Sequence, residues 1–277
     1  FEESRLEWIK YGAYGEWLPP LGKMGGLSQA IPQGGAMDEE AALMANYLVG
    51  NPSDGRVLEC ALQGPVLRLT KASVIALTGS RGSYRLGNSR PILMHQSVHL
   101  PAGSELDLRR IGEGGRLYLA IAPHCTVKRF VERSVLRRRE REMKMALTFA
   151  PGPEWDWLSQ AAQEQLITGT HRILPNSNRM GIRLDANIST ERFQGKEMLS
   201  SGVMPGTIQL TPEGQLLILL KDAQTTGGYP RIGQLTYTAQ QIAARQHLGE
   251  SLSLVGITED EGARQTKRRL GLRQRWC

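Results

Sequence analysis

LLILLKDAQTTGGYPRIG, residues 216–233, joins five consecutive aliphatic residues to a polar, glycine-containing loop. The aliphatic run, Leu216–Leu220, has the length of a buried strand and is too short to span a membrane. The adjacent glycines Gly227 and Gly228 allow the backbone to turn sharply and to expose its N–H groups. A buried strand that leads into such a loop is a common way to present ligand-binding groups. A tight hairpin whose polar residues only bond to one another fits the composition equally well.

The composition favours a β-rich protein with many turns. Hydrophobic residues make up 40% of the 277 residues and aromatic residues only 6%, while 31 residues are glycine. That balance is less typical of a helical bundle, and the length is sufficient for two domains or one large β domain. No apolar run approaches the length of a membrane span, so no membrane association is expected.

The cysteines and histidines do not indicate a metal site. Cys60, Cys125 and Cys277 are odd in number and widely spaced, which argues for a reducing compartment rather than a disulfide framework. His95 and His99 would share one face of a strand, but no carboxylate or cysteine accompanies them. We therefore expect an exposed polar face there and no bound metal.

The formal net charge is +7, and much of the excess lies in residues 128–144 and 264–275. In the first segment Val131 and Val135 are four residues apart among alternating charges, which predicts a solvated linker helix. A surface for an anionic partner is the alternative. Only Phe130 could stack on a base there, so nucleic-acid binding is not expected. The second segment is interpreted as a similar run and as a frayed tail.

Short apolar runs separated by turn residues predict strands in both halves of the chain. In the first half they occupy 57–62, 66–69, 74–77, 92–94, 98–100, 106–108 and 117–122, and in the second 183–184, 207–210, 216–220, 233–238 and 252–257. Short helices are predicted near 155–166 and over 239–247, whereas residues 1–27 have no long periodic pattern and are expected to form a packed arm. The predicted division is an N-terminal β-barrel region (1–126), a basic helical linker (127–147) and a C-terminal β-barrel region (148–277).

One helix is predicted at about residues 38–49 in the N-terminal region. Asp38 is a good N-cap, and the carboxylates of Glu39 and Glu40 favour the positive end of the helix. Gly50 is expected to end it.

Motifs resembling those of one bacterial family occur in the family's order from about residue 21 to residue 254. They are Gly34–Asp38 (GGAMD), Ala45–Asn51 (ANYLVGN), Leu58–Glu59, Gln63–Pro65, Ala76–Gly79, Pro151–Glu154 (PGPE), Asn178–Leu184 (NRMGIRL), Ser201–Gln209 (SGVMPGTIQ) and Asp222–Gly233 (DAQTTGGYPRIG). The chain thus resembles the family of 5-oxoprolinase C subunits, also called allophanate hydrolase subunit 2-like or KipA-like, which is related to the carboxyltransferase region of urea carboxylase.

This resemblance implies a mainly β protein with a few short helices, built from tandem cyclophilin-like β-barrel regions. It implies a cytoplasmic subunit of an ATP-dependent amidohydrolase-type complex that opens a lactam such as 5-oxoproline. The implied partners are a KipI-like B subunit and a LamB/YcsF-like A subunit. ATP would be used through the complex, since this chain has no P-loop motif. Biotin would be involved only if the chain transfers a carboxyl group to a urea-like amide.

An amide-type substrate requires donors for a developing oxyanion and a clamp for a carboxylate or phosphate. On that basis the candidate substrate-binding residues are Asn178, Arg179, Gln209, Gln224, Thr225, Thr226, Gly227, Gly228, Tyr229 and Arg231. No catalytic residue is assigned.

Departures from the family motifs concentrate in the N-terminal half. Where the family has VQDLGRPG, this chain has Pro20 in place of the acidic residue and Lys23 in place of the arginine. Gly34 replaces the serine of SGAMD, and residues 122–125 (APHC) replace GGID. Because proline and glycine carry no functional side chain, a non-catalytic regulatory KipA-like subunit is the alternative function.

Overall fold

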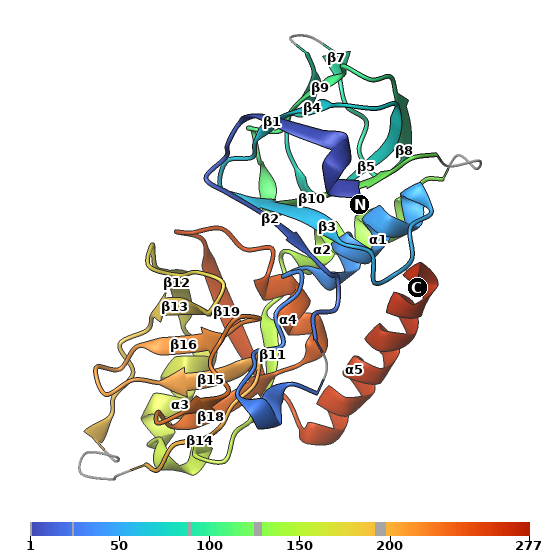
Figure 1. Ribbon diagram of the computed structural model, residues 1–277. Coiled ribbons are helices and arrows are strands. Elements are labelled where there is room, and N and C mark those ends of the chain that lie inside the picture. Colours follow the sequence, from blue (N-terminus) through green and yellow to red (C-terminus); the bar gives the residue numbers. More distant parts are fainter. Residues whose placement is uncertain (1, 24, 88–89, 125–128, 192–197) are drawn as a thin grey trace. The chain divides into compact units, whose positions relative to one another are not determined.

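The structure is a computed structural model that describes residues 2–23, 25–87, 90–124, 129–191 and 198–277 (Figure 1). The described residues form mainly β-strands with five short α-helices, which confirms the predicted fold class. They divide into two compact units, of which the first comprises Phe1–Gly22, Asp38–Met143 and Arg273–Cys277, and the second Lys23–Met37 and Lys144–Leu272. The units are therefore interleaved along the chain, whereas the sequence predicted consecutive segments.

The first unit contains two five-stranded antiparallel sheets, ordered β1-β4-β9-β6-β7 and β2-β3-β10-β5-β8. The strands are β1 (Leu6–Lys10), β2 (Tyr14–Leu18), β3 (Val57–Ala61), β4 (Val66–Leu69), β5 (Ser73–Arg81), β6 (Arg85–Leu86), β7 (Arg90–Pro91), β8 (Ser97–Leu100), β9 (Glu105–Asp107) and β10 (Glu113–Ala122). Aliphatic side chains of both sheets, among them Leu58, Leu67 and Leu106, share one buried core.

The structure differs from the sequence-based expectations for this unit at two places. Residues 1–27, expected to form a packed arm, contain strands β1 and β2, which the sequence did not predict. Neither strand shows a clean alternation of buried and exposed residues, so their own pattern does not reveal them. The strand predicted at 92–94 is absent, since the chain leaves β7 at Pro91 and only Ile92 of that run is buried.

Helix α1 (Glu39–Val49) confirms the prediction made from its caps. The Asp38 carboxylate accepts a hydrogen bond from the Ala41 N–H at 3.1 Å, and Gly50 ends the helix with a left-handed backbone (φ 81°). The helix packs against β5 and β10. There the Thr78 hydroxyl donates to the Ala41 carbonyl at 2.6 Å, and the Asp38 N–H donates to the Tyr118 hydroxyl at 2.8 Å.

Both basic segments are more ordered and more buried than expected. Helix α2 (Arg133–Glu142) buries Val135, Arg139 and Glu142, so it is not a solvated linker over its whole surface. Its Arg139 is ion-paired with Asp38, and its Nη1 lies 3.1 Å from Glu40 Oε2. The C-terminal segment is not a frayed tail, because helix α5 runs over Glu259–Arg273. Apolar spacing could not reveal these pairs, because Arg139 and Asp38 are 101 positions apart.

The second unit is a closed barrel with strand order β11-β18-β15-β16-β13-β12-β19. The strands are β11 (Leu147–Pro151), β12 (Thr170–Ile173), β13 (Gly181–Asp185), β15 (Thr207–Leu210), β16 (Leu216–Leu219), β18 (Arg231–Leu235) and β19 (Ser251–Gly256). β11 and β19 pair in parallel, and the other pairs are antiparallel. Helices α3 (Gln160–Thr168) and α4 (Tyr237–Ala243) lie near the predicted ranges and contribute to the buried barrel core.

No helix in the part of the chain that the structure describes is both long enough and apolar enough to cross a bilayer.

Candidate functional site

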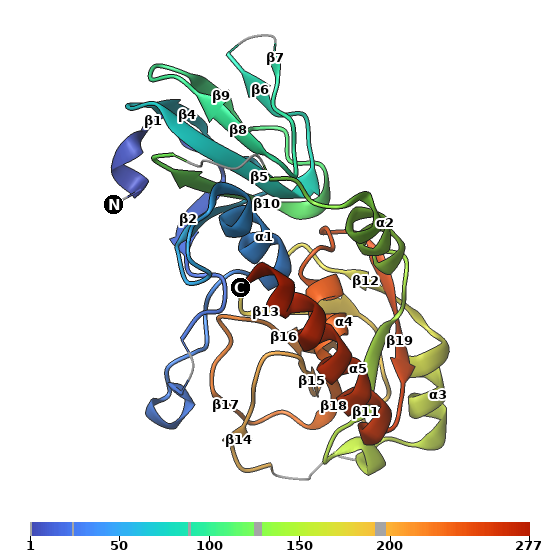
Figure 2. The same ribbon diagram turned by 90° about the vertical axis from the view of Figure 1, so that its right-hand side faces the viewer.

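The loop that follows β16 is carried by the barrel of the second unit. Leu216, Ile218 and Leu219 are buried, as expected for a strand inside a core. The loop then forms strand β17 (Thr226–Gly227), which pairs with β14 (Ser201–Gly202) as a separate two-stranded ribbon (Figure 2). The Val203 N–H donates to the Thr225 carbonyl at 2.9 Å and extends this ribbon. The loop is thus supported from two sides, by the barrel and by the ribbon.

An arginine–aspartate pair fixes the beginning of the loop. The Arg179 Nε lies 2.7 Å from Asp222 Oδ2 and its Nη2 lies 3.0 Å from Oδ1, which is a bidentate pair. The same Nη2 donates to the Gly35 carbonyl at 2.7 Å. The Gly34 N–H donates to the Lys221 carbonyl at 2.9 Å. Three of the sequence motifs, which lie far apart along the chain, therefore converge at this point.

A second arginine–carboxylate pair fixes the end of the loop. The Glu154 carboxylate accepts three hydrogen bonds from Arg231, from the backbone N–H at 2.8 Å, from Nε at 2.9 Å and from Nη2 at 2.8 Å. Only 11% of the Glu154 side chain is exposed. Hydrogen bonding from Arg231 holds the pKa of the Glu154 carboxyl below its usual value, and the same bonds raise the pKa of Arg231. The positive charge of Arg231 is therefore compensated by the Glu154 carboxylate.

Gln209 lies beneath the loop and is fully buried. Its Nε2 donates to the Tyr229 carbonyl at 3.2 Å, whereas its Oε1 has no hydrogen-bond partner among the described residues. A Cβ atom at Gly227 would lie only 2.6 Å from that Nε2. Any larger residue at position 227 would therefore force the buried Gln209 amide or the loop to shift, although the backbone there is not left-handed.

Four side chains of the loop remain available to a ligand. Gln224, Thr226 and Tyr229 are exposed and Thr225 is half-buried. None of these four side chains hydrogen-bonds to another residue within the described ranges, so the polar residues of the loop do not satisfy one another. The described residues thus do not show the tight hairpin whose polar side chains bond to one another, and ligand binding by the loop stays a prediction.

The remaining predicted site residues have other surroundings. The Asn178 side chain accepts a hydrogen bond from the Met180 N–H at 2.8 Å and so stabilises its own turn. Gly228 follows β17 and is exposed. The assignment of the ten residues to substrate binding stays a prediction. Sequence reasoning did not assign Glu154 and Asp222 to the site, although both lie inside matched motifs.

Two of the positions that depart from the family motifs, Pro20 and Gly34, carry no functional side chain. Pro20 is buried in the first unit. Gly34 has a left-handed backbone (φ 60°), and a Cβ there would meet nothing within 4 Å. Cys125 lies outside the described residues.

His95 does not lie on an exposed strand face, as the sequence analysis expected. It lies in the turn before β8 with φ 59°, and its Nδ1 is buried without a partner among the described residues. Burial, together with the charges of Arg139 and Arg81, lowers the pKa of His95 to about 4. His99 is exposed on β8, as expected. The described residues contain no group of three or more His, Cys, Asp or Glu side chains that could hold a metal ion.

Comparison with known proteins gives three consistent similarities. Residues 29–134 and 126–255 match the family described as carboxyltransferase domain, subdomain A and B. The chain is 29% identical to the 5-oxoprolinase C subunit of Escherichia coli K12, over 95% of this chain and 96% of the relative. It is 25% identical to the 5-oxoprolinase C subunit of Haemophilus influenzae, over 89% of this chain and 90% of the relative.

The fold is also that of a region of a larger enzyme. A solved structure of Kluyveromyces lactis urea carboxylase superposes with a TM-score of 0.84 at 18% identity. The match covers 98% of this chain and 29% of that enzyme. At this identity the likeness concerns the fold alone.

Proposed function

Because the chain belongs to the carboxyltransferase domain family with subdomains A and B, we propose that it is a subunit of a 5-oxoprolinase-like complex. The observation that carries the proposal is the similarity to 5-oxoprolinase C subunits over nearly the whole length of both proteins. The complex would open the lactam ring of 5-oxoproline with ATP, and a KipI-like B subunit and a LamB/YcsF-like A subunit would complete it in the cytoplasm.

The loop of the second unit would hold the amide part of the substrate. The side chains of Gln224, Thr225, Thr226 and Tyr229 offer hydroxyl and amide groups that no described residue engages. Such groups can donate to the lactam carbonyl, on which negative charge develops during ring opening. A rigid base keeps donors in place before the reaction, and the two arginine–carboxylate pairs supply it.

The carboxylate of 5-oxoproline would be held by another subunit. Arg179 and Arg231 are each compensated by a bidentate carboxylate, so neither adds net positive charge at the loop. An anionic substrate group then needs a cation from elsewhere, and a partner subunit is the source we propose. ATP would likewise bind outside this chain, which has no P-loop motif.

The proposal is tested by reconstitution. The chain is co-expressed with its A- and B-type partners, and ATP-dependent conversion of 5-oxoproline to glutamate is measured with and without it. We expect turnover only with the complete assembly, and a complete assembly without turnover would reject the 5-oxoproline substrate. Tyr229→Phe is expected to lower kcat/KM about tenfold by removing one donor, whereas the control Tyr11→Phe, at a side chain that is 81% exposed in the other unit, leaves it unchanged.

A non-catalytic regulatory role is the second candidate. It is favoured by the buried Pro20 and by Gly34, which leave two family positions without a functional side chain. In that case the partner subunits would turn over 5-oxoproline without this chain, and its addition would only change their rate. A carboxyltransferase that uses biotin and a urea-like amide is supported by the family model and by the fold likeness to urea carboxylase. We do not favour it, because the similarity to 5-oxoprolinase C subunits extends over nearly the whole length of both proteins.

A further inference from the structure

The ribbon formed by β14 and β17 has two different faces (Figure 2). On the inner face, a Cβ atom at Gly227 would lie 2.6 Å from the Gln209 amide of β15 and 3.5 Å from Val203 Cγ1. Exposure alternates from residue to residue over 200–204 and 224–228, as expected where successive side chains point to opposite faces. The outer face is formed by the exposed residues of both segments, which are Ser200, Gly202, Met204, Gln224, Thr226 and Gly228.

Gly202 lies at the centre of the outer face and leaves it open. It pairs with Thr226 across the ribbon, and a Cβ atom at Gly202 would meet nothing within 4 Å. Its backbone is not left-handed, so the local conformation does not require glycine. Glycine weakens a strand and often marks a place where a ligand approaches closely. The ribbon backbone is therefore bare at a position where any other residue would place a side chain.

Three neutral polar side chains surround this bare position. The hydroxyl groups of Ser200 and Thr226 and the amide of Gln224 hydrogen-bond to no other residue within the described ranges. A Cβ atom at Gly228 would lie 3.8 Å from Ser200 Oγ, which places that hydroxyl on the same face. Hydroxyl and primary amide groups both donate and accept hydrogen bonds. The outer face can therefore bond to the C=O and to the N–H of an amide, and it carries no charge.

The Glu154–Arg231 pair holds the ribbon in place from the barrel side. Besides its bonds to Glu154, Arg231 donates from Nη1 to the Gly202 carbonyl at 3.4 Å. The Val203 N–H donates to the Thr225 carbonyl at 2.9 Å and joins the two segments next to Gly202. Gly202 is thus fixed from within, while its outer side stays open.

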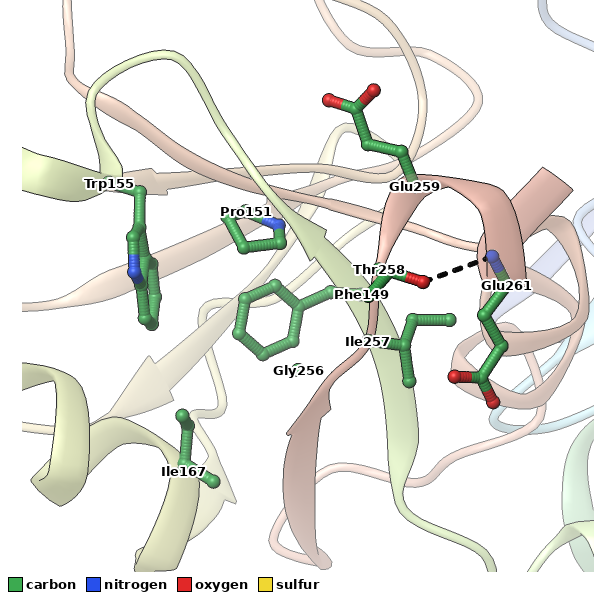
Figure 3. A pocket seen from close by; sticks show the side chains of 9 residues that line it. All are labelled: Phe149, Pro151, Trp155, Ile167, Gly256, Ile257, Thr258, Glu259 and Glu261. Carbon is green, nitrogen blue, oxygen red and sulfur yellow. Dashed lines mark hydrogen bonds between the residues drawn. The ribbon is translucent and has the colours of Figure 1, made fainter.

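A cavity of about 590 Å³ beside β11, α3 and the start of α5 is a less suitable place for an amide (Figure 3). Phe149 on its wall is fully buried. The Thr258 hydroxyl accepts from the Glu261 N–H at 3.3 Å, and the Glu261 carboxylate accepts from Gln265 Nε2 at 3.3 Å. These polar groups are already engaged, whereas those of the outer face are not.

We propose that a small, flat, neutral amide lies on the outer face of the ribbon, and that Gly202 limits the size of the group that fits there. Ser200 is thereby added to the residues that contact the substrate. This placement rests on the proposed function, from which the lactam follows as the occupant. The ring would lie over Gly202, and its C=O and N–H would bond to the side chains of Ser200, Gln224 and Thr226.

The placement is tested on the full-length chain with 2-pyrrolidinone, a lactam that has no carboxylate. Its binding is followed through the backbone amide resonances of the isotope-labelled protein. We expect the largest shifts in residues 200–204 and 224–228. The affinity should be at least about threefold higher than that for cyclopentanone, which lacks the N–H group. 5-Oxoproline should bind this chain no more tightly than 2-pyrrolidinone, because the outer face provides no cation for its carboxylate.

Two glycine variants test the size limit. Gly202→Leu is expected to weaken binding of 2-pyrrolidinone at least about tenfold by covering the bare backbone. Gly271→Leu is the control, because Gly271 is also exposed and a Cβ atom there also meets nothing within 4 Å, and it should change the affinity less than about twofold. An unchanged pattern of amide resonances outside the ribbon shows that Gly202→Leu is folded, so that lost binding is due to the blocked face.

Neighbouring residues of the same type test which face binds. Ser200→Ala should weaken binding about threefold or more, the loss of one neutral hydrogen bond. Ser201→Ala should change it less than about twofold, because Ser201 is half-buried and donates to the Leu199 carbonyl. Thr226→Val should weaken binding more than Thr225→Val, since Thr225 is half-buried.

Four results would overturn the placement on the outer face. They are no binding of 2-pyrrolidinone, shifts confined to the cavity of Figure 3, full affinity in Gly202→Leu, and equal losses in the two serine variants. Failure of the proposed function gives a different result, in which the complete assembly does not turn over 5-oxoproline although 2-pyrrolidinone still binds to the ribbon. Turnover that Gly202→Leu does not reduce would reject the placement alone.

Discussion

The pair between Glu154 and Arg231 offers the most direct test of how the loop is held. In Glu154→Gln the shape of the side chain is kept, but its charge is lost. The carboxylate now accepts from the backbone N–H, Nε and Nη2 of Arg231, at 2.8–2.9 Å. An amide presents one oxygen and one NH₂ group, so one of the Arg231 donors would face another donor.

The size of the expected loss of stability in Glu154→Gln follows from the burial of the Glu154–Arg231 pair. Hydrogen bonds to charged groups contribute about 1.5–3 kcal/mol, and breaking a fully buried pair costs about 3–5 kcal/mol. Because the exposed side-chain fractions are 11% for Glu154 and 23% for Arg231, we expect a loss of about 2–3 kcal/mol in the free energy of unfolding. At about 2–4 °C per kcal/mol, the midpoint of the thermal transition should fall by about 4–12 °C.

Differential scanning calorimetry measures this shift. The control is Asp185→Asn, which removes a charge from an exposed ion pair. The Arg172–Asp185 pair spans 3.7 Å, and its side chains are 63% and 57% exposed, so it should contribute no more than about 1 kcal/mol. The folded-state pKa of Glu154 is depressed, so the stability it contributes is present above the ordinary pKa of 4.5 and is lost as pH falls through the folded-state value. Two results would contradict a stabilising, buried Glu154–Arg231 pair. One is an equal fall of the transition midpoint in both variants, and the other is a difference in midpoint between wild type and Glu154→Gln that persists unchanged into strong acid.

Three further predictions concern packing and charge. Gly227→Ala places a methyl group 2.6 Å from the Gln209 amide and should displace the loop, seen as loss of amide hydrogen-exchange protection there, whereas Gly202→Ala, with nothing within 4 Å, should not. Arg139→Met should destabilise the first unit by about 3–5 kcal/mol in denaturant titration, because the buried Asp38 loses its ion pair. The pKa of His95 is about 4 in the folded state, so protonation favours the unfolded chain, and His95→Gln should reduce the loss of stability between pH 6.5 and 4.

Elements determined by local chemistry could be predicted from the sequence. Helix α1 begins at an N-cap aspartate and ends at a left-handed glycine, and both features involve neighbouring residues only. Strand β16 could also be predicted from neighbouring residues, because a run of five aliphatic residues, Leu216–Leu220, indicates a buried strand. Strands β1 and β2 were missed because their register partners, not their own pattern, decide their structure.

Pairing over long distances in the chain could not be predicted. Arg231 and Glu154 are 77 positions apart, and Arg179 and Asp222 are 43 positions apart. The sequence singled out Arg179 and Arg231 but not their partners, because residue types alone do not distinguish an arginine that binds a ligand from one that is already paired. The same limit applies to α2, whose buried Arg139 could not be distinguished from its solvated neighbours.

The Arg179–Asp222 and Arg231–Glu154 pairs also determine which side chains of the loop can bind a ligand. From the sequence, Arg179 and Arg231 are candidate binding residues on the same footing as the threonines and the tyrosine of the loop. In the structure both arginines are engaged at distances of 2.7–3.0 Å, while the uncharged side chains of the loop remain open. A loop of this kind suits a neutral amide group better than a carboxylate, because it provides donors without net positive charge. Under the proposed 5-oxoprolinase-like function, we therefore expect this chain to contact the ring amide of 5-oxoproline and a partner subunit to bind the carboxylate.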